Sequence, residues 1–271
     1  MRRAWWMGLC LLWACGGDTE PTTTTIALKP PSITTTTAAV PAVAIFAPET
    51  KHAYPVVVMF HGGGWFGGSS LSTAPLAEYL ADQGVVVFNS TYRTSSGGFP
   101  ESFDDVACAI RGARVEAADY TTTPDEISVV GHSAGAHLAS VIALAGDEFG
   151  SQCASAGSAT VDAFVGLAGP YDPTLYRQVL PSFFGTRFEN DPAPWEAGSA
   201  YTYLGNNPTI EVLLMHGGAD ELVPISSSQL FSDALAEAGY EVEFVEVEGA
   251  PHQALRDPNV VGPKVLEFLT Q

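Results

Sequence analysis

Residues 127–145 read ISVVGHSAGAHLASVIALA. The run Ile127–Val130 is typical of a buried strand, and Ala134–Ala145 has the composition of a helix. Between them lies GHSAG, a Gly-x-Ser-x-Gly motif, whose serine takes a strained backbone conformation that requires small residues two positions away on either side. The turn raises the hydroxyl above the sheet, and the next helix directs its first amides at the point where negative charge would form. We therefore predict that Ser133 is a nucleophile and not part of a purely structural glycine turn.

The same alternation of short apolar strands and longer helical patterns runs from about residue 40 to residue 271. We expect strands at Ala42–Ala47, Val56–Phe60, Val85–Asn89, Ile127–Val130, Ala163–Leu167, Val212–Met215 and Val242–Val247. We expect helices at Leu76–Gln83, Phe103–Ala118, Ala134–Ala145, Gln229–Ala238 and Val260–Leu269. Apolar strands separated by helices predict an α/β domain over residues 40–271, with a mostly parallel sheet of about eight strands and helices on both faces. Catalytic residues of such sheets follow the carboxyl ends of the strands.

A glycine run, His61-Gly62-Gly63-Gly64-Trp65, follows the expected strand Val56–Phe60. Glycines there let backbone amides approach a substrate oxygen, which a side chain would prevent. We expect the amides of Gly63, Gly64 and Ala134 to form an oxyanion hole. A phosphate-binding loop is disfavoured because no lysine follows at the spacing of such loops.

Two further residues that carry chemistry follow the last two expected strands. Asp220 lies just after Val212–Met215, and His252 lies just after Val242–Val247. A serine hydroxyl needs an imidazole to take its proton, and the imidazole needs a carboxylate to fix its tautomer. We predict that Ser133, Asp220 and His252 form a catalytic triad, with Glu221 as the alternative carboxylate. No spacing of His, Cys and Asp residues indicates a metal site.

The bulk composition narrows the classes of partner. The chain has 271 residues, 46% of them hydrophobic, and a formal net charge of -19, with 30 Asp and Glu against 11 Lys and Arg. The apolar content suits a substantial core. Such an acidic chain with no basic stripe is a poor partner for nucleic acid.

The amino terminus has the pattern of an export signal. Arg2 and Arg3 precede an apolar run from Ala4 to Ala14, which is too short to span a bilayer. Leu12-Trp13-Ala14-Cys15 resembles a bacterial lipobox. We expect residues 1–14 to be a signal peptide and Cys15 to be acylated, so that the protein is held at the cell envelope by this lipid alone. An ordinary signal peptide cut nearby is the alternative. Residues 15–39 are rich in Thr and Pro and are expected to form an extended tether.

Two features remain open in the sequence. Removal of the leader and acylation of Cys15 leave Cys108 and Cys153, which export would allow to join in a disulfide, although both could be buried thiols. The stretch 171–207 interrupts the strand and helix pattern with eight aromatic residues among prolines and glycines. It is either a partial cap over a pocket or a loop whose aromatics pack inward.

Taken with the strand context, these motifs resemble the α/β-hydrolase superfamily, in its carboxylesterase and lipase branch. The likeness lies in residues 61–65, Tyr92-Arg93, residues 131–135 and residues 220–224. Both hormone-sensitive-lipase-like carboxylesterases and feruloyl or acetyl-xylan esterases share it. The resemblance implies attack of Ser133 on an ester carbonyl, an acyl-enzyme hydrolysed by water, and no cofactor.

The resemblance leaves the substrate open. No large cap precedes the first glycine motif, so short acyl groups or esters on sugars fit better than long-chain lipids. An arylformamidase or a peptidase with the same triad is one alternative. A non-catalytic binding module of the same fold is another.

Overall fold

The computed structural model describes residues 27–34, 42–94 and 97–271. They build an eight-stranded sheet with the strand order β1-β2-β4-β3-β5-β6-β7-β8. The strands are β1 (Leu28–Thr34), β2 (Val43–Pro48), β3 (Val56–Phe60), β4 (Val86–Ser90), β5 (Ile127–His132), β6 (Ala163–Leu167), β7 (Glu211–Gly217) and β8 (Glu241–Val247). In this order, all pairs from β4 to β8 are parallel, whereas β1–β2 and β2–β4, at one edge, are antiparallel. The predicted mostly parallel sheet is confirmed.

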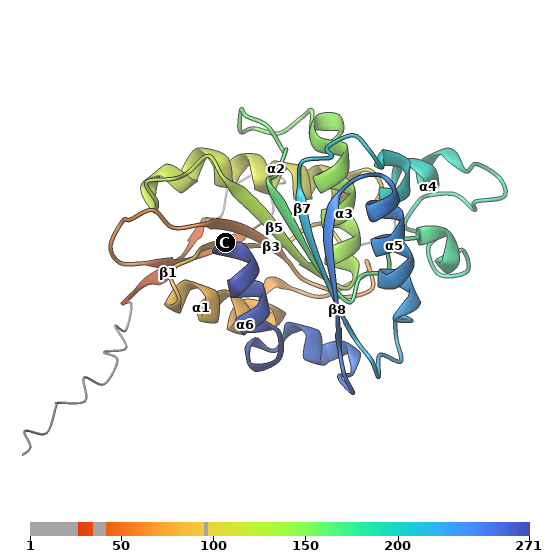
Figure 1. Ribbon diagram of the computed structural model, residues 1–271. Helices are drawn as coiled ribbons and strands as arrows, with labels where there is room; N and C mark the ends of the chain where they lie inside the picture. Colours follow the sequence, from red (N-terminus) through yellow and green to blue (C-terminus); the bar gives the residue numbers. More distant parts are fainter. Residues whose placement is uncertain (1–26, 35–41, 95–96) are drawn as a thin grey trace, which may run out of the picture.

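Helices cover both faces of this sheet (Figure 1). They are α1 (Ala74–Asp82), α2 (Glu101–Glu116), α3 (Ala134–Ala145), α4 (Ala193–Ala197), α5 (Ser226–Glu237) and α6 (Pro258–Leu269). Helices α1 and α6 contact each other on one face, and α2, α3 and α5 lie on the other. The five long helices match the expected ones, with starts two to three residues earlier for all except α3.

Strand β3 shows why the central strands are continuous apolar runs. All five of its residues are buried. Val56, Val58 and Phe60 belong to the core beneath α2 and α3, whereas Val57 and Met59 belong to the core beneath α1 and α6. A strand that is covered on both faces gains from an apolar residue at every position, so the alternation of a half-exposed strand is absent.

The edge strand β1 departs from the expectation that residues 15–39 form an extended tether. Residues 28–34 instead pair with β2, with Lys29 opposite Ala47 and Thr34 opposite Val43. The register shifts between Lys29 and Ser32, where two prolines that have no backbone N–H interrupt the ladder. Cys15 and the predicted signal peptide lie outside the described residues.

The stretch 171–207 buries four of its eight aromatic side chains. It holds two short 3₁₀ turns, Pro173–Tyr176 and Ala200–Tyr203, on either side of α4. Tyr171, Phe183, Phe184 and Trp195 are fully or almost fully buried in the core that also contains α2 and α3. The inward-packing alternative therefore describes these four aromatics.

A disulfide joins Cys108 of α2 to Cys153 in the loop after α3. Of the two states that the sequence left open for these cysteines, the structure has the bonded one.

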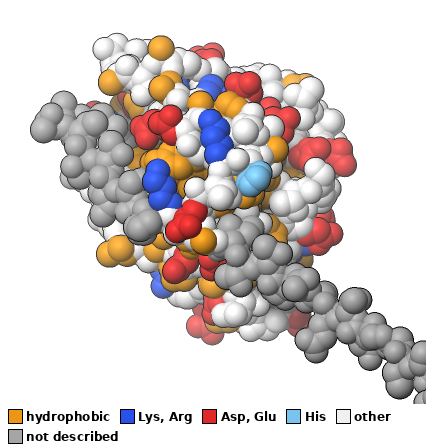
Figure 2. All heavy atoms as spheres, turned by 90° about the vertical axis from the view of Figure 1, so that its left-hand side faces the viewer, with side chains coloured by type: hydrophobic (Ala, Val, Ile, Leu, Met, Phe, Trp, Pro, Cys, Tyr) orange, Lys and Arg blue, Asp and Glu red, His pale blue; other side chains and the backbone are white. Residues whose placement is uncertain are grey.

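No helix in the described part of the chain is both long and apolar enough to cross a bilayer. On the face shown in Figure 2, the Lys and Arg side chains stand among Asp and Glu and form no continuous basic stripe outside the grey residues.

Candidate active site

Ser133 lies at the sharp turn between β5 and α3. Its backbone has φ 55° and ψ -123°, a conformation that residues other than glycine rarely adopt. A Cβ at Gly131 would lie 2.5 Å from the Cα of Ala136, and one at Gly135 would lie 2.4 Å from the carbonyl oxygen of His61. The residues two positions before and after the serine must therefore be glycine, because the turn packs closely against α3 and the end of β3.

The three residues predicted to form a triad are brought within hydrogen-bond distance of one another. His252 Nε2 lies 2.9 Å from Ser133 Oγ, and His252 Nδ1 lies 2.6 Å from Asp220 Oδ2. A carboxylate only accepts, so Nδ1 carries the proton and Nε2 is free to accept the proton of the serine hydroxyl. The three side chains come from the segments after β5, β7 and β8, at the carboxyl ends of these strands.

Asp220 is held by donors on both of its oxygens. Oδ1 accepts hydrogen bonds from the amides of Leu222 and Val223, each at 2.9 Å. Burial by itself would raise the pKa of Asp220, but the hydrogen bonds from Val223, His252 and Leu222 outweigh it and lower the pKa. The carboxylate is therefore ionised at neutral pH. Glu221, the alternative carboxylate, is exposed. Within the described part of the chain it forms no hydrogen bond with His252.

A second buried histidine also faces Asp220. His216 Nε2 lies 3.0 Å from the carbonyl oxygen of Val223 and 3.1 Å from Asp220 Oδ2, whereas Nδ1 lies 2.7 Å from Ser228 Oγ. Because both partners of Nε2 are acceptors, Nε2 carries the proton and Nδ1 accepts from the serine hydroxyl. Burial lowers the pKa of His216, so the ring stays neutral. Sequence reasoning missed this contact, although the spacing of four residues from His216 to Asp220 hints at it.

His132, the residue before Ser133, supports the loop that carries His252. Its Nε2 lies 3.2 Å from the carbonyl oxygen of His252, and the two rings lie 5.0 Å apart. Since a carbonyl only accepts, this nitrogen donates. Burial, together with the neighbouring His252, lowers the pKa of His132 to about 3. His132 is thus a neutral donor that ties the serine turn to the histidine loop.

The glycine run after β3 forms a tight loop beside Ser133. Gly63, Gly64 and Trp65 all have positive φ angles, of 144°, 62° and 67°. A Cβ at Gly63 would lie 2.1 Å from the carbonyl oxygen of Gly67, so only glycine fits this position. Ala134 begins α3, and the amide of a first helical residue has no partner within its helix. These backbone amides therefore belong to segments that meet at the serine.

The triad opens into a cavity of about 380 Å³. Its walls combine the glycine loop and the side chains of Ser133 and His252 with other residues from the segments after β6, β7 and β8. They include Gly63, Gly64, Trp65, Ser72, Ser133, Pro170, Tyr176, Leu222, Val223, His252, Gln253 and Arg256. Tyr176 is thus the one aromatic of the stretch 171–207 that faces this cavity.

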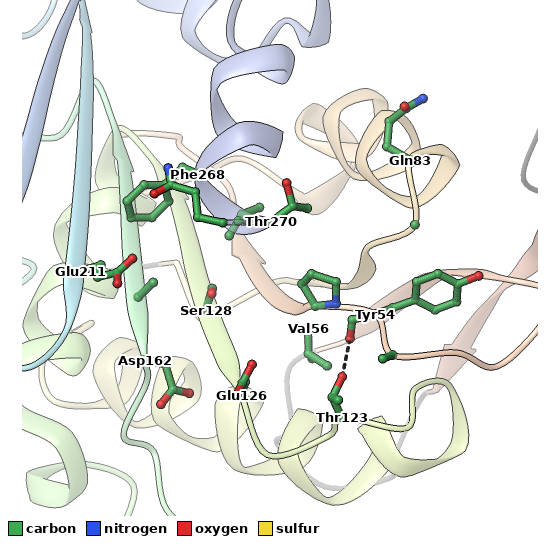
Figure 3. A pocket seen from close by; sticks show the side chains of 16 residues that line it. Tyr54, Val56, Gln83, Thr123, Glu126, Ser128, Asp162, Glu211, Phe268 and Thr270 are labelled. Atoms are coloured by element: carbon green, nitrogen blue, oxygen red, sulfur yellow. Dashed lines mark hydrogen bonds between the residues drawn. The ribbon is translucent and has the colours of Figure 1, made fainter. Parts of the chain in front are cut away.

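A larger hollow of about 700 Å³ lies at the opposite end of the sheet (Figure 3). Its lining includes Val56, Ser128 and Glu211, which stand at the amino ends of β3, β5 and β7. The Asp162 carboxylate there accepts a hydrogen bond from the Ile127 amide and so serves the sheet. Catalytic sites of open α/β sheets lie at the carboxyl ends, so we assign the candidate active site to the smaller cavity.

Among curated proteins, this chain is similar to several esterases. It is 30% identical over 213 residues to Esterase LipQ of Mycobacterium tuberculosis (strain ATCC 25618 / H37Rv), covering 73% of this chain and 50% of LipQ. It is 27% identical over 226 residues to the probable isoprenylcysteine alpha-carbonyl methylesterase ICME of Oryza sativa subsp. japonica, covering 78% of this chain and 55% of that protein. The chain thus spans about half the length of the curated relatives it matches.

Solved structures of esterases have a similar fold. Esterase Est2 of the Planctomycetes species Thermogutta terrifontis, with propionate bound, has 26% identity and a TM-score of 0.69, covering 92% of this chain and 93% of that one. A truncated carbohydrate esterase from gut microbiota has 22% identity and a TM-score of 0.73, covering 84% of this chain and 89% of that one. The expected α/β-hydrolase fold is therefore confirmed.

The family model for BD-FAE matches residues 43–235. This range contains the glycine loop, the serine turn and Asp220, and most of the sheet that positions them. From this match we conclude that the chain belongs to the BD-FAE family.

Proposed function

We propose that this chain is a serine carboxylesterase that hydrolyses short-chain or sugar-linked esters through an acyl-enzyme intermediate. The proposal rests chiefly on the hydrogen-bonded series from Ser133 through His252 to Asp220, with distances of 2.9 Å and 2.6 Å. The similarity to proteins named esterase and carboxylic ester hydrolase supports the same class of reaction.

We assign each step of this reaction to one of these three side chains. His252 Nε2 accepts the proton of Ser133 Oγ as that oxygen attacks the ester carbonyl, and Asp220 stabilises the imidazolium that forms. His252 then gives the proton to the leaving alcohol, which leaves an acyl group on Ser133. A water molecule, deprotonated by the same imidazole, attacks the acyl-enzyme. The acid is then released as His252 returns that proton to Ser133 Oγ.

The amides of Gly63, Gly64 and Ala134 are proposed to form the oxyanion hole. The positive φ angles of the glycine loop and the position of Ala134 at the start of α3 support this role. Amides held in this way stabilise the tetrahedral intermediate, and loss of one donor of this kind typically costs about 3–4 kcal/mol of transition-state stabilisation.

The size of the cavity favours small acyl groups. A volume of about 380 Å³ must hold the acyl group and part of the alcohol. Similar structures include an esterase with propionate or butyrate bound and an acetyl ester-xyloside bifunctional hydrolase. These comparisons support short acyl chains and acetylated sugars as substrates.

Hydrolysis of p-nitrophenyl esters of increasing acyl length by the purified chain tests this proposal. We expect turnover of acetate and butyrate esters, weak turnover of long-chain esters, and loss of measurable activity in Ser133→Ala, whose circular dichroism spectrum should match that of the wild type. Full turnover in Ser133→Ala would disprove the assignment of the nucleophile. A preference for aryl formamides or peptides over every ester would move the chain to another class of hydrolase.

We further propose that the protein is exported and anchored through a lipid on Cys15. The basic and apolar start of the chain and the resemblance of residues 12–15 to a lipobox support this, as does the disulfide between Cys108 and Cys153, since such bonds persist in oxidising compartments. Mass spectrometry of the protein extracted from membranes should show a chain that begins at an acylated Cys15, and Cys15→Ser should release it from the membrane. An unmodified first residue would exclude the anchor.

A further inference from the structure

Arg256 stands at the edge of the catalytic cavity on the same turn as His252. This 3₁₀ turn, η6, spans His252–Arg256. Gln253 and Arg256 line the catalytic cavity, and with Ser72 they also line a neighbouring hollow of about 510 Å³. The two hollows therefore adjoin each other at three polar side chains, and we refer to both together as the groove.

The guanidinium of Arg256 is left without a protein partner in the described part of the chain. Arg93 pairs with Asp105 at 2.8 Å. Arg111 pairs with Asp147, also at 2.8 Å. Arg256 has no carboxylate within 4.0 Å and no hydrogen bond to a described residue, although the chain has 30 acidic residues against 11 basic ones. Its five N–H donors are thus available to a ligand in the groove.

The adjacent acid, Asp257, lines the neighbouring hollow but forms no ion pair with Arg256. Asp257 caps the start of α6, where its Oδ1 accepts hydrogen bonds from the backbone and side-chain nitrogens of Asn259, at 2.9 Å and 3.0 Å. Arg256 itself is half-buried, so its charge is less screened by solvent than that of an exposed arginine.

The part of the substrate that meets Arg256 follows from the chemistry of the proposed reaction. The leaving alcohol must receive its proton from His252 Nε2, so the alcohol side of the ester lies next to η6. Arg256 is on that turn, four residues after His252. A group carried by the alcohol is therefore within the groove that Arg256 lines, whereas the oxyanion lies at the glycine loop.

We propose that Arg256, assisted by Gln253, binds a carboxylate on the alcohol portion of the substrate, so that the preferred substrates are esters of acidic sugars or of other hydroxy acids. A planar guanidinium and a carboxylate form a bidentate, charge-assisted pair, which a neutral sugar cannot provide. This inference rests on the proposed esterase activity and adds a substrate class to it.

A matched pair of substrates tests the inference. The acetyl esters of methyl galacturonoside and of methyl galactoside share the acyl group and the ring, and they differ in a carboxylate at C6. We expect the wild type to have a kcat/KM about tenfold higher for the acidic ester, mainly through a lower KM, and we expect this preference to fall in 0.5 M salt. Arg256→Gln should reduce the ratio to about one, and Arg256→Lys should retain part of it.

Arg187→Gln is the matched control, because Arg187 is exposed and does not line the groove. Its ratio should equal that of the wild type. A wild-type ratio near one, or a ratio that survives in Arg256→Gln, would overturn the inference.

Binding separates this inference from the proposed activity. In Ser133→Ala, calorimetry should show tighter binding of the acidic ester than of the neutral one, and Arg256→Gln in that background should remove the difference. If the wild type hydrolyses no p-nitrophenyl acetate but this difference in binding persists, the proposed activity fails and the anion site stands. If hydrolysis proceeds but the binding difference is absent, the anion site fails alone.

Discussion

At the scale of single residues, the site has one imidazole placed to exchange a proton with substrate and several that stay neutral. His252 contacts Ser133, whereas His132 and His216 each donate one hydrogen bond into the triad or its loop. Burial lowers the pKa of both His132 and His216. Because these two rings remain uncharged, they fix the positions of His252 and Asp220 without adding a competing positive charge.

The donors around Asp220 predict how an amide would behave there. In Asp220→Asn, the amide oxygen should take the place of Oδ1, which accepts from the Leu222 and Val223 amides. The NH₂ group would then face His252 Nδ1 and force the other tautomer, so that Nε2 carries a proton toward Ser133 and cannot accept one. We expect kcat to fall by about 10⁴-fold, as the equivalent change does in serine proteases.

Glu221→Gln is the control for this substitution, because Glu221 is the neighbouring exposed carboxylate. Its kcat should stay within about twofold of the wild-type value, as expected of a surface charge outside the site. Steady-state kinetics on a short p-nitrophenyl ester measures both variants. Equal losses in Asp220→Asn and Glu221→Gln would mean that the carboxylate has been assigned to the wrong residue.

At the scale of elements, the sequence best predicts strands, helices and loops whose residue types follow directly from their own burial or backbone conformation. The run Val56–Phe60 is apolar throughout because both of its faces are covered, and the order of strands and helices follows from such runs. The triad could be placed because each member follows a parallel strand, and carboxyl ends of parallel strands meet at one edge of the sheet. The glycine loop could be placed because glycine tolerates the positive φ angles and the close backbone contact found at Gly63.

Other elements depend on contacts that hydropathy does not report. β1 reads LKPPSIT, and this composition indicates a tether. The segment nevertheless joins the sheet, because its backbone pairs with β2. The aromatics of residues 171–207 would have the same sequence pattern whether they packed inward or covered a pocket. The contact of His132 with His252 joins segments more than a hundred residues apart in the sequence. The contact of His216 with Asp220 depends on how the backbone turns after β7.

At the scale of the whole molecule, His137 connects three parts of the fold that meet at the site. The indole N–H of Trp65, in the glycine loop, donates to His137 Nδ1 at 3.0 Å, and His137 Nε2 lies 2.8 Å from the carbonyl oxygen of Gly198, in the stretch 171–207. An indole only donates and a carbonyl only accepts, so a single neutral tautomer satisfies both contacts. Protonation of His137 would set two donors against each other in the core.

This arrangement predicts a pH dependence of global stability. Burial lowers the pKa of His137 to about 4, below its ordinary value of 6.5. Between these two pH values the unfolded chain binds a proton that the folded chain does not, so the free energy of unfolding is fully retained above pH 6.5 and declines as the pH falls toward 4. One such group contributes a slope of up to about 1.4 kcal/mol per pH unit.

His137→Gln isolates this contribution, because a glutamine can accept from Trp65 and donate to Gly198 but does not titrate. Urea unfolding from pH 4.5 to 7.5 should give a free energy of unfolding that depends on pH less steeply in the variant than in the wild type, by about 1 kcal/mol per unit below pH 6.5. His52→Gln, at an exposed position, should leave the wild-type slope unchanged.

The slope is compared and not the absolute stability, because the His137→Gln substitution also changes packing. Parallel curves for His137→Gln and the wild type would show that His137 takes up its proton equally in both states, and the hydrogen bonds to Trp65 and Gly198 would then not hold the glycine loop against the core.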